Sequence, residues 1–174
     1  GWDICNQSYR EAVDQHGVLP ADVRALIQDD LESLHCAQGI SVQSDETPIR
    51  GAIDDTRAVA HPERPLRILT DTVEREIESF KETTGVAHVV LIDLSSTATT
   101  PQDAPFHHHL DAFEDALDQP AQELFGSMSA GMLYAYAGLK QGCSYVNFTP
   151  SLTVDLPALH QLALKSGVPV CGKD

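Results

Sequence analysis

Two clusters of polar side chains follow apolar runs in the sequence, and their residue types could bind a ligand. Asn147, Thr149 and Ser151 come after "CSYV", and residues 95–97 (Ser-Ser-Thr) come after "HVVLIDL". Asn supplies one acceptor and two donors, and each Ser or Thr supplies a hydroxyl, so together they could hold a carboxamide or a sugar. The same residue types are common in turns and helix caps, so both interpretations remain open.

A third candidate is Asp3, which follows Trp2 at the end of a possible strand. An acidic residue in that position can accept a hydrogen bond from the ribose of a dinucleotide. The alternative is an N-cap for the following helix. The sequence contains neither GxGxxG nor GxxxxGK[ST], so a nucleotide site would lack its usual phosphate loop.

For the other residues with metal-binding or reactive side chains, the sequence pattern favours a structural role. His107–His109 are consecutive and cannot share one helix face, which favours a solvated turn over a metal site. The acidic run 111–118 is typical of a solvated helix face. The four cysteines lack metal or redox spacing, and Cys143 and Cys171 beside apolar runs are expected to be buried. We therefore predict no metal, and reduced thiols, which suit a cytoplasmic protein.

Composition excludes some partners. The chain has 174 residues, and 11 basic minus 26 acidic residues give a net charge of −15. Such a surface repels phosphate backbones, so we expect no nucleic acid partner. The sequence shows no apolar run of about 20 residues, so we expect no membrane partner.

Hydrophobic periodicity predicts an α/β fold. Helices are expected over residues 8–17, 20–36, 66–84, 108–118, 129–141 and 155–166, and strands over 88–94, 144–148 and 168–172. From residue 66 the alternation of helices and strands is typical of a mainly parallel sheet, whose ligands lie beyond the carboxyl ends of the strands. The continuous apolar run 88–94 predicts a strand buried on both faces. Residues 37–65 read as an irregular loop.

Several stretches together resemble the myo-inositol-1-phosphate synthase family. They are "GWDI", "LRILTDTVEREIESF", "VVLIDLSST" and "LYAYAGLKQGCSYVNFTPSLTVDLPALHQLALKSGVPVCGKD", in the same order as in the family and in a bacterial or archaeal form. The resemblance implies a Rossmann-like NAD-binding domain and a second domain for catalysis and tetramer assembly. It also implies conversion of glucose 6-phosphate to inositol phosphate by transient oxidation with NAD, enolisation, intramolecular aldol closure and re-reduction, in inositol and phospholipid biosynthesis.

The resemblance also implies which residues meet NAD. These are Asp3, Leu94, Ser95, Ser96, Thr97, Asn147, Phe148, Thr149 and Asp174. Residues 1–150 would be the C-terminal portion of the NAD-binding domain, and residues 151–174 the start of the catalytic and oligomerisation part.

The sequence departs from the family at three points. The glycine-rich loop is missing, Ala98 replaces an acidic residue, and the family's catalytic lysines lie beyond Asp174. We therefore expect a central piece of the enzyme, inactive alone and with no assignable catalytic residue. The alternatives are a non-catalytic relative that binds a dinucleotide or sugar phosphate, and an unrelated Rossmann-like oxidoreductase.

Overall fold

The computed structural model describes residues 1–3, 8–42 and 61–172. The chain forms two compact units, Gly1–Val59 and Ala60–Asp174, and each is described by itself. No described helix has the length and apolar character that crossing a membrane requires. The sequence-based division at residue 150 stays a prediction.

Three short helices make up most of the described part of the first unit. Helix α1 (Tyr9–His16) begins with a capping box of Ser8 and Glu11 and ends at Gly17, whose φ of 59° is left-handed. The single helix expected over residues 20–36 is wrong, because the chain forms α2 (Ala21–Leu26) and α3 (Gln28–Ser33). Ile27 between them has a non-helical φ of −114°, and no residue of either helix is buried.

The first unit also contains a small parallel ladder. Strand β1 (Trp2–Asp3) pairs with β2 (Ala37–Gln38), with Trp2 beside Ala37 and Asp3 beside Gln38. The Asp3 carbonyl accepts from the backbone N–H of Gly39. This pairing places Asp3 at the carboxyl end of a strand, as the sequence predicts.

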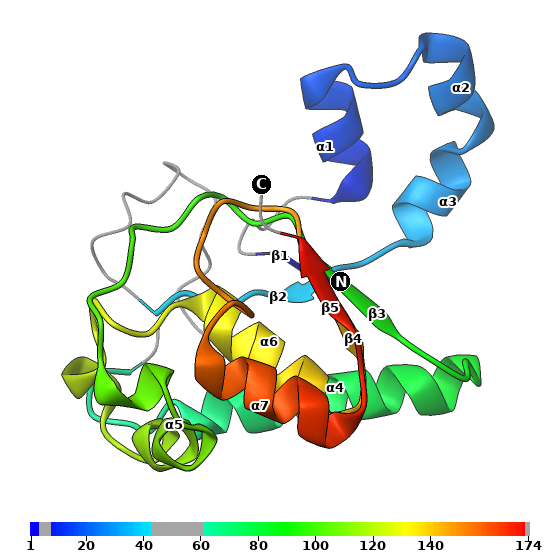
Figure 1. Cartoon of the computed structure of the whole chain (residues 1–174). Coiled ribbons are helices and arrows are strands. Elements are labelled where there is room, and N and C mark those ends of the chain that lie inside the picture. Colours follow the sequence, from blue (N-terminus) through cyan, green and yellow to red (C-terminus); the bar gives the residue numbers. More distant parts are fainter. Residues whose placement is uncertain (4–7, 43–60, 173–174) are drawn as a thin grey trace. The chain divides into compact units, whose positions relative to one another are not determined.

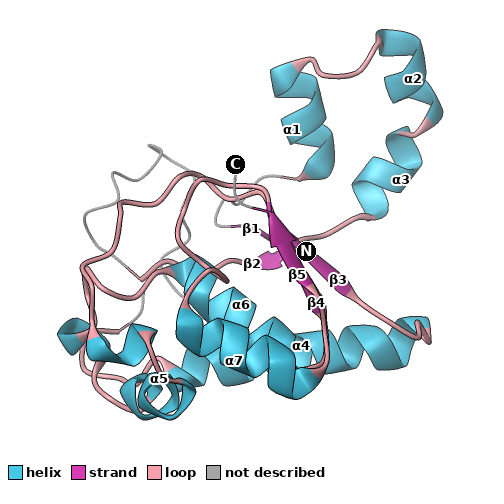
Figure 2. Ribbon diagram, viewed as in Figure 1, coloured by secondary structure: helices cyan, strands magenta, loops and turns pink. Residues whose placement is uncertain are grey.

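The second unit is an α/β layer with a parallel sheet, which confirms the predicted fold class. Its strands pair in the order β3–β4–β5, with helices α4, α6 and α7 grouped beside the sheet (Figures 1 and 2). The strands are β3 (Val90–Asp93), β4 (Ser144–Asn147) and β5 (Val170–Gly172). The helices are α4 (Arg67–Thr84), α5 (Leu110–Leu117), α6 (Ala130–Lys140) and α7 (Pro157–Ser166), with 3₁₀ turns at Pro105–His107 and Ala121–Glu123.

Local sequence signals explain most helix ends. The Ser129 side chain caps α6, and Pro157 stands in the first turn of α7, where its missing N–H costs nothing. Gly85 and Gly167 end α4 and α7 in the left-handed conformation. The N-cap position of α7 is Leu156, which provides no side-chain cap.

The core lies between the helices and one face of the sheet. Fully or nearly fully buried side chains include Leu66, Val73, Phe113, Leu133, Tyr136, Leu139 and Leu159. Gly138 of α6 lies close to the sheet, since a Cβ there would come within 2.4 Å of the end of the Leu91 side chain. Helix α6 therefore packs on the face of β3 that carries Leu91.

The opposite face of β3 is exposed, so the predicted burial on both faces is wrong. Val90 is 51% exposed and Ile92 is 57% exposed. Successive side chains of a strand alternate between its two faces, and α6 packs against the face that carries Leu91. Cys171 lies in register with Val146 and Ile92 and is exposed, contrary to the prediction, whereas Cys143 is buried as predicted.

Arg67 of α4 forms hydrogen bonds with residues of α6 and with residues in and directly after α5. Its guanidinium donates two hydrogen bonds of 2.9 Å to the carboxylate of Asp118 and one of 3.1 Å to the hydroxyl of Tyr136. The hydrogen bond from Arg67 lowers the pKa of Asp118 below its ordinary value. The acidic run in α5 is thus partly used to bind a neighbouring helix.

Candidate functional site

The carboxyl ends of β3 and β4 lie side by side. Asp93 pairs with Asn147 in parallel register, and the backbone N–H of Phe148 donates to the Asp93 carbonyl at 3.0 Å. The two polar clusters therefore meet at the carboxyl ends of the strands, where ligands of a parallel sheet are expected to bind. We call this edge, residues 93–98 with 147–151, the strand-end site.

Asn147 organises the turn after β4. Its side-chain Nδ2 donates to the Ser151 carbonyl at 2.9 Å, and its Oδ1 accepts from the Thr149 N–H at 2.9 Å and hydroxyl at 2.8 Å. The Thr149 hydroxyl also accepts from the Ser151 N–H at 3.1 Å. Because Asn147 is 1% exposed and Thr149 is 2% exposed, these side chains hold the turn and do not face solvent.

Ser151 joins the turn to the other loop. Its hydroxyl oxygen accepts from the backbone N–H of Ala98 at 2.9 Å, and Ser151 itself is buried. The backbone N–H of Ala98 thus fixes the end of the loop formed by residues 95–97. The shape of one loop therefore depends on the other.

Asp93 fixes the start of that loop. One carboxylate oxygen accepts from the Ser95 N–H at 3.0 Å, and the other accepts from the Tyr145 hydroxyl at 2.9 Å. The pKa of Tyr145 is raised well above its ordinary value, mainly because the side chain is buried. The negative charge of Asp93 and the hydrogen bond to it raise this pKa further. Gly131 in the first turn of α6 approaches closely, since a Cβ there would lie 3.2 Å from the same carboxylate.

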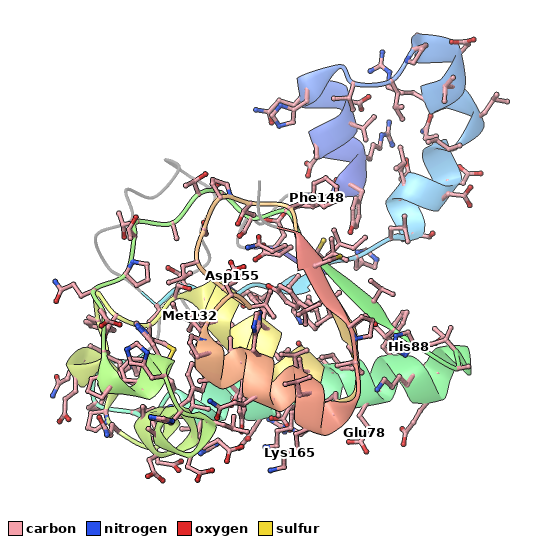
Figure 3. All side chains as sticks on the ribbon, in the orientation of Figure 1. Glu78, His88, Met132, Phe148, Asp155 and Lys165 are labelled. Carbon is pink, nitrogen blue, oxygen red and sulfur yellow. The ribbon has the colours of Figure 1, made fainter. Side chains whose placement is uncertain are left out.

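The residues between these anchors point outward. Leu94 is 75% exposed and Phe148 is 66% exposed, and residues 95–97 are also exposed. Figure 3 shows Phe148 at the carboxyl end of the sheet and His88 at the opposite end. The strand-end site thus offers apolar surface and exposed hydroxyl groups side by side, a combination that suits a ring carrying a polar amide or sugar.

The predicted cofactor residues fall into three groups. Leu94, Ser95, Ser96, Thr97 and Phe148 form the exposed part of the strand-end site, and Asn147 and Thr149 support it from within. Asp3 belongs to the other compact unit. Asp174 lies outside the described residues.

Sequence reasoning missed Asp93 and Tyr145. A signal for Asp93 was available, because it is the one charged residue in the apolar run "HVVLIDL". Tyr145 gave no such signal, since a tyrosine in a strand is more often a packing residue. Its role depends on where the Asp93 carboxylate lies in three dimensions.

The histidine run is not a solvated turn throughout, which corrects the prediction. His107 is 2% exposed; its Nδ1 accepts from the Ala104 N–H at 3.2 Å and its Nε2 donates to the Ser127 carbonyl at 2.8 Å. His108 and His109 are exposed. Within the described ranges no group of three or more His, Cys, Asp or Glu side chains is placed to hold a metal ion.

Comparison with known proteins identifies the family. The family model described as myo-inositol-1-phosphate synthase, an NAD-binding domain model, matches residues 1–174. Inositol-3-phosphate synthase 1 of Bacteroides thetaiotaomicron is 26% identical over the whole chain, and inositol-3-phosphate synthase of Drosophila melanogaster is 27% identical. The chain spans 38% and 29% of these two curated relatives.

A solved structure shows the same fold. The crystal structure of inositol-3-phosphate synthase from Caenorhabditis elegans superposes with a TM-score of 0.83 at 18% identity, covering 100% of this chain and 33% of that one. The family match over residues 1–174 excludes an unrelated Rossmann-like oxidoreductase. The chain belongs to the myo-inositol-1-phosphate synthase family and corresponds to its NAD-binding segment.

Proposed function

We propose that the protein is an NAD-dependent inositol-3-phosphate synthase that converts glucose 6-phosphate to inositol phosphate. The observation that carries the proposal is the strand-end site, where Leu94 and Phe148 are exposed on a frame of buried hydrogen bonds. The family match over the whole chain supports it. Transient oxidation of the sugar, enolisation, intramolecular aldol closure and re-reduction make up the proposed reaction.

The described residues fit the nicotinamide end of NAD. Leu94 and Phe148 provide apolar surface for a planar ring, and the hydroxyl groups of residues 95–97 can hydrogen-bond an amide or a ribose. When bound, NAD supplies the hydride acceptor and donor of the reaction. We further propose that Asp3 and Asp174 bind the cofactor, as the resemblance implies.

The role of this segment is to bind and orient. Asn147 and Ser151 hold the two loops in one arrangement, which limits the motion of anything bound between them. We assign no catalytic residue to the chain. The lysines that the family resemblance implies for catalysis have no counterpart that we can assign among residues 1–174.

The test uses the protein expressed from its complete reading frame. Incubation with glucose 6-phosphate and NAD should yield inositol phosphate without net accumulation of NADH. Phe148→Ala should weaken NAD binding about three- to tenfold, the loss expected for one aromatic contact. Leu164→Ala on α7 is the matched control, because Leu164 is an exposed apolar residue outside the strand-end site. Absence of both product and NAD binding would refute the proposal.

A second candidate function is a non-catalytic relative that binds a dinucleotide or a sugar phosphate. Ala98, in place of the acidic residue that the resemblance implies, favours it. The same assay separates the two, since a binding protein would retain NAD or glucose 6-phosphate without forming product.

Three further properties are proposed from the family resemblance. They are a homotetrameric assembly, a cytoplasmic location and a place in phospholipid biosynthesis. The unpaired thiols of the described cysteines support the location. Light scattering on the complete protein would test the assembly, and a mass of one subunit would exclude it.

A further inference from the structure

Asp93 combines a charge with a central position in the strand-end site. Its carbonyl accepts from Phe148, and its two carboxylate oxygens accept from Ser95 and Tyr145. Both partners of the carboxylate are donors, so this pattern suits its ionised form, which only accepts. The nearby first turn of α6 also favours a negative charge there, because the N-terminus of a helix is electropositive.

The two redox forms of a nicotinamide cofactor differ by one charge on the ring. The oxidised ring is cationic and the reduced ring is neutral, while the rest of the molecule is the same. A carboxylate near the ring therefore raises the affinity for the oxidised cofactor relative to that for the reduced cofactor. A contact that depends only on shape changes both affinities by the same factor.

We propose that Asp93 is a specificity-determining residue that makes the strand-end site prefer the oxidised over the reduced nicotinamide cofactor. This inference rests on the proposed function, since it needs the ring to bind between Leu94 and Phe148. Such a preference favours the oxidised form at the end of each turnover, when the ring ketone of the product precursor has been reduced.

Isosteric substitution separates charge from positioning. In Asp93→Asn the side-chain oxygen can still accept from Ser95, and the amide can donate to the Tyr145 hydroxyl, so the loop keeps its anchor while the charge is lost. Asp93→Glu keeps the charge but changes the reach of the carboxylate. A loss of positioning would lower both affinities in the same proportion, and a loss of charge would lower only the affinity for the oxidised form.

The experiment measures the Kd values for NAD⁺ and NADH by titration calorimetry on the complete protein and its variants. Asp93→Asn should reduce the ratio Kd(NADH)/Kd(NAD⁺) about three- to tenfold, as expected for one charge at a partly exposed site. Asp93→Glu should retain the ratio of the unmodified protein. The control is Glu78→Gln, which removes one negative charge from α4, far from Phe148 in Figure 3, and should leave the ratio unchanged.

The outcomes distinguish this inference from the proposed function. If the unmodified protein binds neither form, the proposed function fails. If it binds NAD⁺ but Asp93→Asn leaves the ratio unchanged, or Asp93→Glu abolishes the preference, only the role of Asp93 is refuted. An equal shift with Glu78→Gln would assign the effect to the overall charge of the protein and would also refute that role.

Discussion

Replacing Asn147 with Ala tests the buried frame of the strand-end site. The side chain makes three hydrogen bonds, two with Thr149 and one with the Ser151 carbonyl, and it is 1% exposed. Ala removes all three and leaves the Thr149 N–H and the Ser151 carbonyl without their partner. The turn must then admit water or keep unsatisfied backbone groups.

The expected loss of unfolding free energy is about 4–6 kcal/mol. Three hydrogen bonds at about 1 kcal/mol each give about 3 kcal/mol, and leaving a buried backbone group unsatisfied adds about 1–3 kcal/mol. Thr149→Val keeps the shape of its side chain but removes two of the hydrogen bonds around the turn, so about 2 kcal/mol is expected. The double variant should lose less than the sum, because both single changes remove one shared bond.

Urea unfolding followed by far-UV circular dichroism gives the free energies. Thr149→Ser is the matched control, because it keeps the hydroxyl and loses one buried methyl group, at about 1 kcal/mol. A loss below 1 kcal/mol for Asn147→Ala, or strict additivity with Thr149→Val, would show that the turn does not depend on this network.

Two other changes test the packing of the second unit. Replacing Gly with Ala usually stabilises a helix, but at Gly131 the new Cβ would lie 2.5 Å from the Thr153 methyl group. Gly131→Ala should therefore lower the free energy of unfolding, measured in urea, by about 1–3 kcal/mol. A gain in stability would contradict this packing. The hydrogen bond from Arg67 lowers the pKa of Asp118 in the folded state. The stabilisation is therefore present above the unfolded pKa of about 3.9 and is lost as the pH falls through the folded value. Asp118→Asn should be less stable than the unmodified protein at pH 6 and equally stable near pH 2, and an unchanged difference at both pH values would refute the ion pair.

Much of the fold could be predicted from local patterns. The capping box of Ser8, the cap at Ser129, and Gly85 and Gly167 at helix ends act within one turn of the chain, so the sequence alone reveals them. The break at Ile27 could not be predicted this way. The apolar positions on either side of it match a helix period, but neither short helix has a buried residue.

Residue types alone could not predict the roles of individual residues in the candidate site. Asn147 and Phe148 are adjacent in the sequence and both were predicted to contact the cofactor, yet Asn147 is buried and Phe148 is 66% exposed. His107 shows the same limit, since its burial depends on Ser127, 20 residues away. In each case a distant segment decides whether the side chain meets water or protein.

From residue 66 onward, the amino-acid sequence by itself determined the alternation of helices and strands, the parallel sheet and the meeting of the polar segments at the carboxyl ends of β3 and β4. These follow from hydrophobic period and from the right-handed connection of parallel strands, which depend on neighbours along the chain. Only the tertiary structure decided which polar residues support the site and which face solvent, and that Asp93 meets Tyr145. Burial and hydrogen-bond partners depend on elements that are far apart in sequence and adjacent only after folding.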